Sequence, residues 1–147
     1  MKNSRKWKSV AGILLDVNHF KSINDQFGHT MGDDAIRSMG MVLSQVSTER
    51  STAFRLAGDE FIILTGGAQE AETEALIAGI EQKLEAFDAS AGKPYQLSVA
   101  MGYTICDTAG LDYDEFLHGM DRKMYQAKDR YYSQAERDRR RKPEQNR

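Results

Sequence analysis

Two adjacent carboxylates, Asp59 and Glu60, stand between two apolar segments and are candidates for binding a divalent cation. Residues 52–56 alternate polar and apolar side chains and residues 61–64 are all apolar, so both segments are predicted strands. Gly58 can adopt positive φ in a tight connection, which predicts a β-hairpin with the two acids at its tip. Acidic residues at hairpin tips often serve turn geometry alone, but paired carboxylates on rigid elements also suit hard cations.

A third carboxylate, Asp16, directly follows the apolar run of residues 10–15. Such a run is typical of a central strand that is covered on both faces, and ligands of open α/β sheets bind at the carboxyl ends of strands. If the hairpin pairs beside this strand, Asp16 converges with Asp59 and Glu60. Two or three carboxylates with a backbone carbonyl would form a Mg²⁺ site that phosphate oxygens complete.

Positive groups for a phosphate ligand would come from Lys21, Lys128 and the start of a helix near Asp33. Each has a simpler interpretation, because surface lysines are usually solvated and aspartate often caps a helix. Taken together with the acids, the set suits phosphoryl or nucleotidyl transfer. In such reactions, positioning and charge neutralisation supply most of the catalysis.

Composition limits the kind of protein. The 147 residues suit a single domain with one core, and the net charge of −2 gives no general attraction to nucleic acid. The single cysteine, Cys106, excludes an internal disulfide and a multi-cysteine metal site. No apolar run approaches the roughly 18 residues of a membrane span, and the start lacks a secretory signal, so we expect a cytoplasmic location without a membrane segment. The chain could still be one piece of a larger protein.

Hydrophobic periodicity predicts the elements that would position these side chains. In order, they are a strand over 10–15, a short helix or turn over 17–29, a long helix from 32, the hairpin, a helix over 70–88, a strand over 95–103 and a helix from about 112. The strand over 95–103 alternates large and small side chains, and its small face would let a helix pack closely. We expect an α+β fold with a central, mostly antiparallel sheet flanked by helices, in one domain over 1–133. The basic tail, 134–147, is expected to be frayed or disordered.

The same segments carry a resemblance to a known family. Residues 15–33 (LDVNHFKSINDQFGHTMGD) resemble the strand-to-helix signature of the GGDEF family, the diguanylate cyclases, and residues 55–61 (RLAGDEF) resemble the motif that names it. Residues 97–102 and 121–128 resemble the late strand and the last helix of the family. The likeness covers about residues 10–130, and the first two signatures at this separation are specific.

The resemblance implies a polymerase-palm-like fold, similar to nucleotide cyclases, that condenses two GTP into cyclic di-GMP and releases pyrophosphate. Mg²⁺ or Mn²⁺ would be the cofactor, held by Asp16, the Val17 carbonyl and Asp59. Glu60 would help to hold a second metal ion or would accept the proton of the attacking 3′-hydroxyl. Because each domain would hold one GTP, the active species would be a homodimer, and a sensory domain in the full-length protein would regulate it.

The resemblance also assigns substrate contacts. Asn24 and Asp33 would contact the guanine edge, His29 would lie near the nucleotide, and Lys21 and Lys128 would touch phosphates. The donors N1–H and N2–H₂ of guanine suit a carboxylate acceptor such as Asp33, and an asparagine amide can meet its O6 or N3. Asn24 and Asp33 could instead be turn and cap residues, and His29 a loop residue.

Departures from the family pattern keep a second hypothesis open. Ala57 replaces the first glycine of the motif, next to Gly58 where the backbone would meet the substrate, and a positive φ at alanine would cost on the order of 1 kcal/mol. The usual lead-in before the first strand is missing, and Tyr131 and Tyr132 replace the Gly-Arg that normally follows the lysine of the last helix. The alternative is a catalytically silent GTP-binding regulatory module. We favour the enzyme because all the acids are retained.

Overall fold

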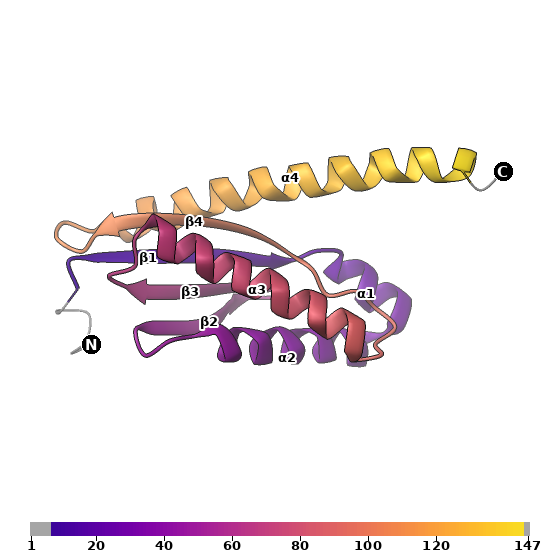
Figure 1. Ribbon diagram of the computed structural model, residues 1–147, viewed down its shortest axis with the longest axis horizontal. Coiled ribbons are helices and arrows are strands. Elements are labelled where there is room, and N and C mark those ends of the chain that lie inside the picture. Colours follow the sequence, from indigo (N-terminus) through magenta and orange to yellow (C-terminus); the bar gives the residue numbers. More distant parts are fainter. Residues whose placement is uncertain (1–6, 146–147) are drawn as a thin grey trace.

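The computed structural model describes residues 7–145, with side chains for residues 7–140. Its elements are β1 (Ser9–Val17), α1 (Phe20–Phe27), α2 (His29–Val46), β2 (Ser51–Ala57), β3 (Glu60–Gly66), α3 (Glu70–Ser90), β4 (Val99–Asp107) and α4 (Tyr113–Gln145). The four strands form one antiparallel sheet in the order β2-β3-β1-β4 (Figure 1). The predicted α+β architecture and the predicted order of elements are confirmed.

The sheet separates two apolar layers, because alternate residues of β1 point to opposite faces. Ile13, Leu15 and Val17 pack on one face with α2 and α3. Leu14 lies on the other face with the α4 side chains Phe116, Met120 and Met124. The central strand is therefore buried on both sides, as its continuous apolar run predicts.

Two boundaries differ from the sequence-based expectation. The strand predicted over 95–103 runs over Val99–Asp107, because β1, its pairing partner, ends at Val17 opposite Val99. Tyr95 and Leu97 are buried, but the Leu97 N–H donates to the Asp88 carboxylate (2.8 Å) instead of to a strand. Their alternation with polar residues thus reflects burial without strand pairing.

The long helix begins at His29, three residues before the predicted start. Gly28, with φ 91°, separates α1 from α2, and its carbonyl accepts the N–H groups of Met31 (3.1 Å) and Gly32 (3.1 Å). Asp33 consequently lies in the second turn of α2, so its predicted place at the helix start is wrong.

The last helix starts after Asp112, whose carboxylate accepts the N–H groups of Asp114 (2.9 Å) and Glu115 (3.3 Å) as an N-cap. Residues 134–145, expected to be frayed or disordered, continue α4 as helix beyond the end of the sheet (Figure 1). The Arg140–Glu136 ion pair (3.0 Å) links neighbouring turns there. Within the described part of the chain, none of the helices is long and apolar enough to cross a membrane.

Close packing of α4 on the sheet requires small residues on β4, and the prediction that the small face of this strand admits a helix is confirmed. A β-carbon on Gly102 would overlap the α4 backbone at Met120, Lys123 and Met124. The neighbouring Ala100 is buried in the same layer. The approach of α4, and with it the position of Lys128, depends on this contact.

We expect Gly102→Ala to destabilise the fold by about 3 kcal/mol, because rigid backbone cannot move away from the added methyl group. Urea denaturation measures the change. The matched control is Gly40→Ala in α2, where the added carbon meets open space and the free energy of unfolding should rise by about 0.5–1 kcal/mol. Equal stabilities of the two variants would contradict this account.

Candidate functional site

The tip of the β2–β3 hairpin lies beside the end of β1. The β1–β3 register places Asp16 opposite Glu60, and the Val17 N–H donates to the Asp59 carbonyl (3.1 Å). Gly58 adopts φ 46° in the turn, as expected. The predicted convergence of the first strand with the hairpin tip is confirmed, and it brings Asp16, Val17, Asp59 and Glu60 to one end of the sheet.

Asp16 is a buried carboxylate, only 7% exposed, on the face of the sheet that α4 covers. Its Oδ2 accepts a hydrogen bond from the Lys128 ammonium at 2.7 Å. Its Oδ1 is buried and has no hydrogen-bond partner among the described residues. Because a buried polar atom without a partner costs about 1–3 kcal/mol, this oxygen fits a metal ion.

Asp59 reaches the same point from the hairpin. Burial, followed by the Asp16 carboxylate beside it, raises the pKa of Asp59 to about 6. The Asp16 carboxylate therefore lies close enough to Asp59 to disfavour its charged form. A divalent ion between them would favour the charged form of Asp59.

Glu60 lies at the margin of this pair. Burial, the charge of Asp16 and the charge of Asp121 on α4 raise its pKa. Across the described residues, no three Asp, Glu, His or Cys side chains converge to hold a metal ion. A cation here would bind Asp16 and Asp59, with the remaining ligands from the Val17 carbonyl and from phosphate oxygens. The role of Glu60 as a metal ligand stays a prediction.

Lys128 places a positive charge next to the acidic side chains. Burial disfavours its ammonium form, but the hydrogen bond and charge of Asp16, with smaller contributions from Tyr132 and Asp59, outweigh burial and raise the pKa of Lys128. It remains charged at any physiological pH. A group that neutralises Asp16 in this way can also neutralise a phosphate oxygen.

α1 begins three residues after Val17, and its N-terminus has no side-chain cap. His19 precedes the helix, and no side chain caps its first turn. Unpaired N–H groups at a helix N-terminus bind anions. Asn18 before it is 1% exposed, donates to Ser98 Oγ (3.2 Å) and has a buried Oδ1 without a partner among the described residues.

The predicted guanine-binding residues lie on α1 and α2. The Asn24 amide packs where a β-carbon of Gly32 would lie, immediately before Asp33, so these two predicted contacts are neighbours. Asp33, His29 and Lys21 are exposed. No hydrogen bond or ion pair among the described residues joins these four side chains to Asp16 or Asp59, and their roles stay predictions.

Sequence reasoning missed the contacts of His19, Asp121 and Tyr132 at this site. His19 is polar and Asp121 is one of many acids on α4, so neither is distinctive in sequence. Tyr132 carried a signal, because it follows Lys128 by four residues and therefore shares its helix face.

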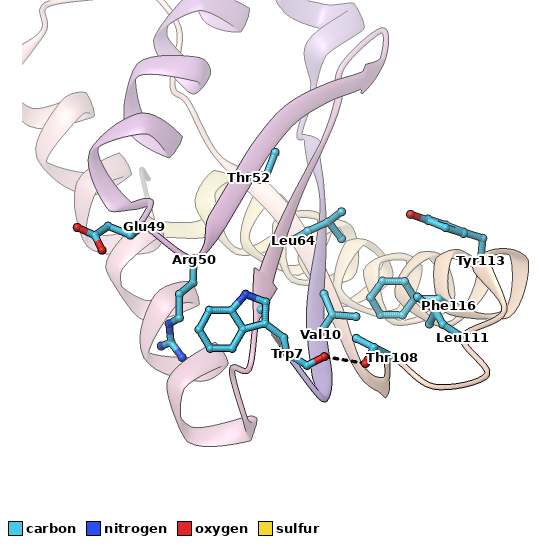
Figure 2. A pocket seen from close by; sticks show the side chains of 11 residues that line it. Trp7, Val10, Glu49, Arg50, Thr52, Leu64, Thr108, Leu111, Tyr113 and Phe116 are labelled. Atoms are coloured by element: carbon cyan, nitrogen blue, oxygen red, sulfur yellow. Dashed lines mark hydrogen bonds between the residues drawn. The ribbon is translucent and has the colours of Figure 1, made fainter. Parts of the chain in front are cut away.

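A cavity of about 360 Å³ lies elsewhere, near the start of β1 and the end of β3. Figure 2 shows Trp7 and Arg50 on one side of it and Leu64, Tyr113 and Phe116 among the other lining residues. It contains none of the predicted site residues. The carboxylates of Asp16 and Asp59 lie at the other end of β1.

Comparison with known proteins now decides the family. The family model described as diguanylate cyclase, GGDEF domain, matches residues 1–134. The chain belongs to the GGDEF family. The predicted resemblance is confirmed, and the GGDEF domain fills most of the chain.

Relatives of this GGDEF domain are named for different activities. Diguanylate cyclase DosC of Escherichia coli K12 is 31% identical over 135 residues, which are 90% of this chain and 29% of that protein. Cyclic di-GMP phosphodiesterase NbdA of Pseudomonas aeruginosa is 29% identical over 121 residues, 82% of this chain and 16% of that protein. The chain therefore spans less than a third of these relatives. An EAL/GGDEF domain protein from M. capsulatus has a solved structure with a TM-score of 0.73 and 29% identity, covering 86% of this chain and 83% of that one.

The raised pKa of Asp59 predicts a pH-dependent stability of the metal-free GGDEF domain. The folded-state pKa of Asp59 is about 6, above the ordinary value of 3.8, so folding favours the protonated form. The stability that protonated Asp59 contributes is fully present below about pH 4 and is lost as the pH rises through about 6. At pH 7.5 in EDTA, we therefore expect the free energy of unfolding of Asp59→Asn to be higher than that of wild type by about 1 kcal/mol, a figure that allows for solvent screening.

Thermal denaturation of the two proteins in EDTA and in Mg²⁺ checks this expectation. Mg²⁺ should stabilise wild type and have little effect on Asp59→Asn. The control is Asp25→Asn, which changes an exposed acid of α1. An Asp59→Asn variant that is less stable than wild type in EDTA at pH 7.5 would argue against the acidic contact.

Proposed function

We propose that this GGDEF domain is a metal-dependent diguanylate cyclase, which joins two GTP molecules into cyclic di-GMP with release of pyrophosphate. The observation that carries the proposal is the position of Asp16 beside the hairpin tip that holds Asp59 and Glu60, with one buried Asp16 oxygen that has no partner among the described residues. Two neighbouring carboxylates beside a lysine and a helix N-terminus without a side-chain cap suit a metal-bound polyphosphate. Family membership supports the same chemistry.

In this proposal, separate residues bind the metal ion, neutralise phosphate charge and accept the proton. Asp16, Asp59 and the Val17 carbonyl hold Mg²⁺ or Mn²⁺, which neutralises phosphate oxygens when it is bound. Lys128 balances the remaining phosphate charge. Glu60, whose pKa is raised, accepts the proton of the attacking 3′-hydroxyl or contributes to a second metal site.

Substrate recognition in this proposal uses α1, α2 and the hairpin turn. Asn24 and Asp33 contact the guanine edge and His29 lies near the nucleotide, while Lys21 supplies a further positive charge. The Ala57–Gly58 backbone passes next to the substrate. Since each domain holds one GTP, two domains must face each other, and a homodimer is the active species. Sensory domains in a longer protein would control that pairing.

Purified protein incubated with GTP and Mg²⁺ or Mn²⁺ should release cyclic di-GMP and pyrophosphate in a 1:2 ratio. The rate should rise more steeply than linearly with protein concentration, because two domains must meet. Chromatography of the nucleotides and a coupled pyrophosphate assay measure both products.

Asp59→Asn should lower this rate at least a hundredfold, since loss of a metal-binding carboxylate removes transition-state charge stabilisation. Asp25→Asn should retain it. Folded wild-type protein that makes no cyclic di-GMP at high concentration would refute the cyclase proposal.

A second candidate is a GTP-binding regulatory module without turnover. Tyr131 and Tyr132, in place of the usual Gly-Arg, motivate it. Ala57 does not, because His19 is the single non-glycine residue with positive φ in the described chain, so the expected strain at Ala57 is absent. This candidate predicts saturable GTP binding with no product, and an unchanged regulatory output in Asp59→Ala.

A further inference from the structure

Residues 93–98 lead from the end of α3 to β4 without forming a strand, and contacts with other elements hold them in place. The Asp88 carboxylate near the end of α3 accepts the Leu97 N–H at 2.8 Å. The Ser98 carbonyl accepts the N–H of Asn18, which directly follows β1, at 2.9 Å. The segment is therefore tied both to α3 and to the end of the central strand.

A further contact ties the same segment to α2. The Tyr95 hydroxyl donates to Asp34 Oδ2 at 2.6 Å, and the Lys93 ammonium lies 3.0 Å from the same oxygen. Tyr95 is 6% exposed and belongs to the apolar layer that the sheet shares with α2 and α3. Because a protein interior is closely packed, the ring has little freedom to move, and its hydroxyl is a fixed donor for the Asp34 carboxylate.

The contact joins a neutral donor to a charged acceptor. The hydrogen bond from Tyr95 lowers the pKa of Asp34, and the charges of Lys93 and Arg37 add to this effect. Burial, followed by the hydrogen bond to Asp34, raises the pKa of Tyr95 to about 12. At any physiological pH, Tyr95 is therefore protonated and Asp34 is ionised. Hydrogen bonds to ionised acceptors are stronger than those between neutral groups.

The first turns of α2 need such a contact, because the helix has no side-chain cap. Gly28, with φ 91°, precedes α2, and the first turn contains no acidic residue. Asp34 lies in the second turn, with a side chain that is 18% exposed. Its hydrogen bond with Tyr95 joins this end of the helix to the segment over 93–98.

The same turns of α2 carry or contact the predicted guanine-binding residues. Asp33 directly precedes Asp34, and its side chain is exposed. Consecutive helix residues point about 100° apart, so Asp34 can be bound within the fold while Asp33 meets a ligand. The Asn24 amide of α1 packs against Gly32, so a movement of these turns would also displace Asn24.

We propose that Tyr95 is a positioning residue for guanine recognition, which acts through Asp34 to hold the first turns of α2 where Asp33 can meet the base. The inference rests on the proposed function in one respect, because it takes Asp33 to be a guanine contact. The competing explanation is that the Tyr95–Asp34 hydrogen bond serves only the stability of the fold, in which case its loss would affect every ligand equally.

The test is the preference of Tyr95→Phe for guanine over hypoxanthine, since this variant keeps the ring and removes the hydroxyl. Calorimetric titrations use the Mg²⁺ complexes of GDP, IDP and pyrophosphate, none of which the proposed reaction consumes. IDP lacks the N2 amino group, which is one of the donors that suit the Asp33 carboxylate. Pyrophosphate has no base and reports on phosphate binding alone.

Wild type should bind GDP about tenfold more tightly than IDP, because a hydrogen bond to a charged acceptor typically contributes about that factor. In Tyr95→Phe we expect the ratio of the two affinities to fall to about threefold or less, because Asp33 then lacks a fixed position. Affinity for pyrophosphate should stay within about twofold of wild type.

Tyr103→Phe is the matched control, because the Tyr103 hydroxyl also donates to a carboxylate, that of Glu74 on α3, at 3.2 Å. Its ratio of GDP affinity to IDP affinity should equal that of wild type. Asp34→Asn is the conservative variant, since its amide oxygen can still accept from Tyr95, and its ratio should lie closer to wild type than that of Tyr95→Phe. Thermal denaturation of each variant separates a loss of folding from a loss of base selectivity.

Asp33→Ala tests whether Tyr95 acts through the base contact. This substitution should lower the ratio by itself, and adding Tyr95→Phe to it should lower the ratio no further, because both changes remove one interaction. Separate losses that multiply in the double variant would contradict the proposed route.

The outcomes distinguish this inference from the cyclase proposal. An unchanged ratio in Tyr95→Phe overturns the inference even if wild type makes cyclic di-GMP. An equal loss of affinity for all three ligands also overturns it, because that pattern indicates a general structural role. A selective loss for GDP supports it even if wild type makes no cyclic di-GMP. If wild type binds GDP and IDP equally, the inference fails.

Discussion

Burial of the Asp16 carboxylate is the constraint on which the rest of the site depends. A charged group with 7% exposure is unfavourable unless it is paired, and among the described residues Asp16 has one partner for its two oxygens. Lys128 offsets part of that desolvation, whereas Asp59 adds a second negative charge beside it. The fold thus keeps a local excess of negative charge that a bound cation would relieve. The same excess of negative charge lowers the stability of the metal-free domain and raises its affinity for a metal ion.

The surrounding architecture explains how Asp16 comes to be buried. It occupies the central strand of the sheet, on the face that α4 covers, and α4 approaches closely because Gly102 presents no side chain to it. The same approach determines where Lys128 and Tyr132 lie. A glycine in the middle of β4 is therefore as important for the site as the acids, although it contacts none of them.

Sequence patterns predicted the site where short-range rules apply. The apolar run before Asp16, the turn at Gly58 and the motif around Asp59 each determine local structure, and antiparallel pairing of neighbouring segments brings them together. Boundaries that depend on particular backbone pairings were missed. The start of β4 depends on where β1 ends, and the start of α2 depends on the carbonyl of Gly28.

Contacts across the fold were also beyond the reach of sequence patterns. The hydrogen bond between Tyr132 and His19 joins residues 113 positions apart and has no periodic signature. Conversely, the alternation over residues 95–98 predicted a strand because burial and strand pairing produce the same pattern. Periodicity reports which side chains are buried, and the neighbouring backbone decides which of them form a strand.

α4 is one uninterrupted helix of 33 residues, and its rotational phase is shared by the core and the site. Met120 and Met124 fix that phase against the sheet, and Lys128 and Tyr132 continue the same row at intervals of four. A single residue inserted after Met124 would turn everything downstream by about 100°. The segment between Met124 and Tyr132 can therefore accept substitutions but no insertion or deletion, whereas a change of length beyond Tyr132 leaves this row intact.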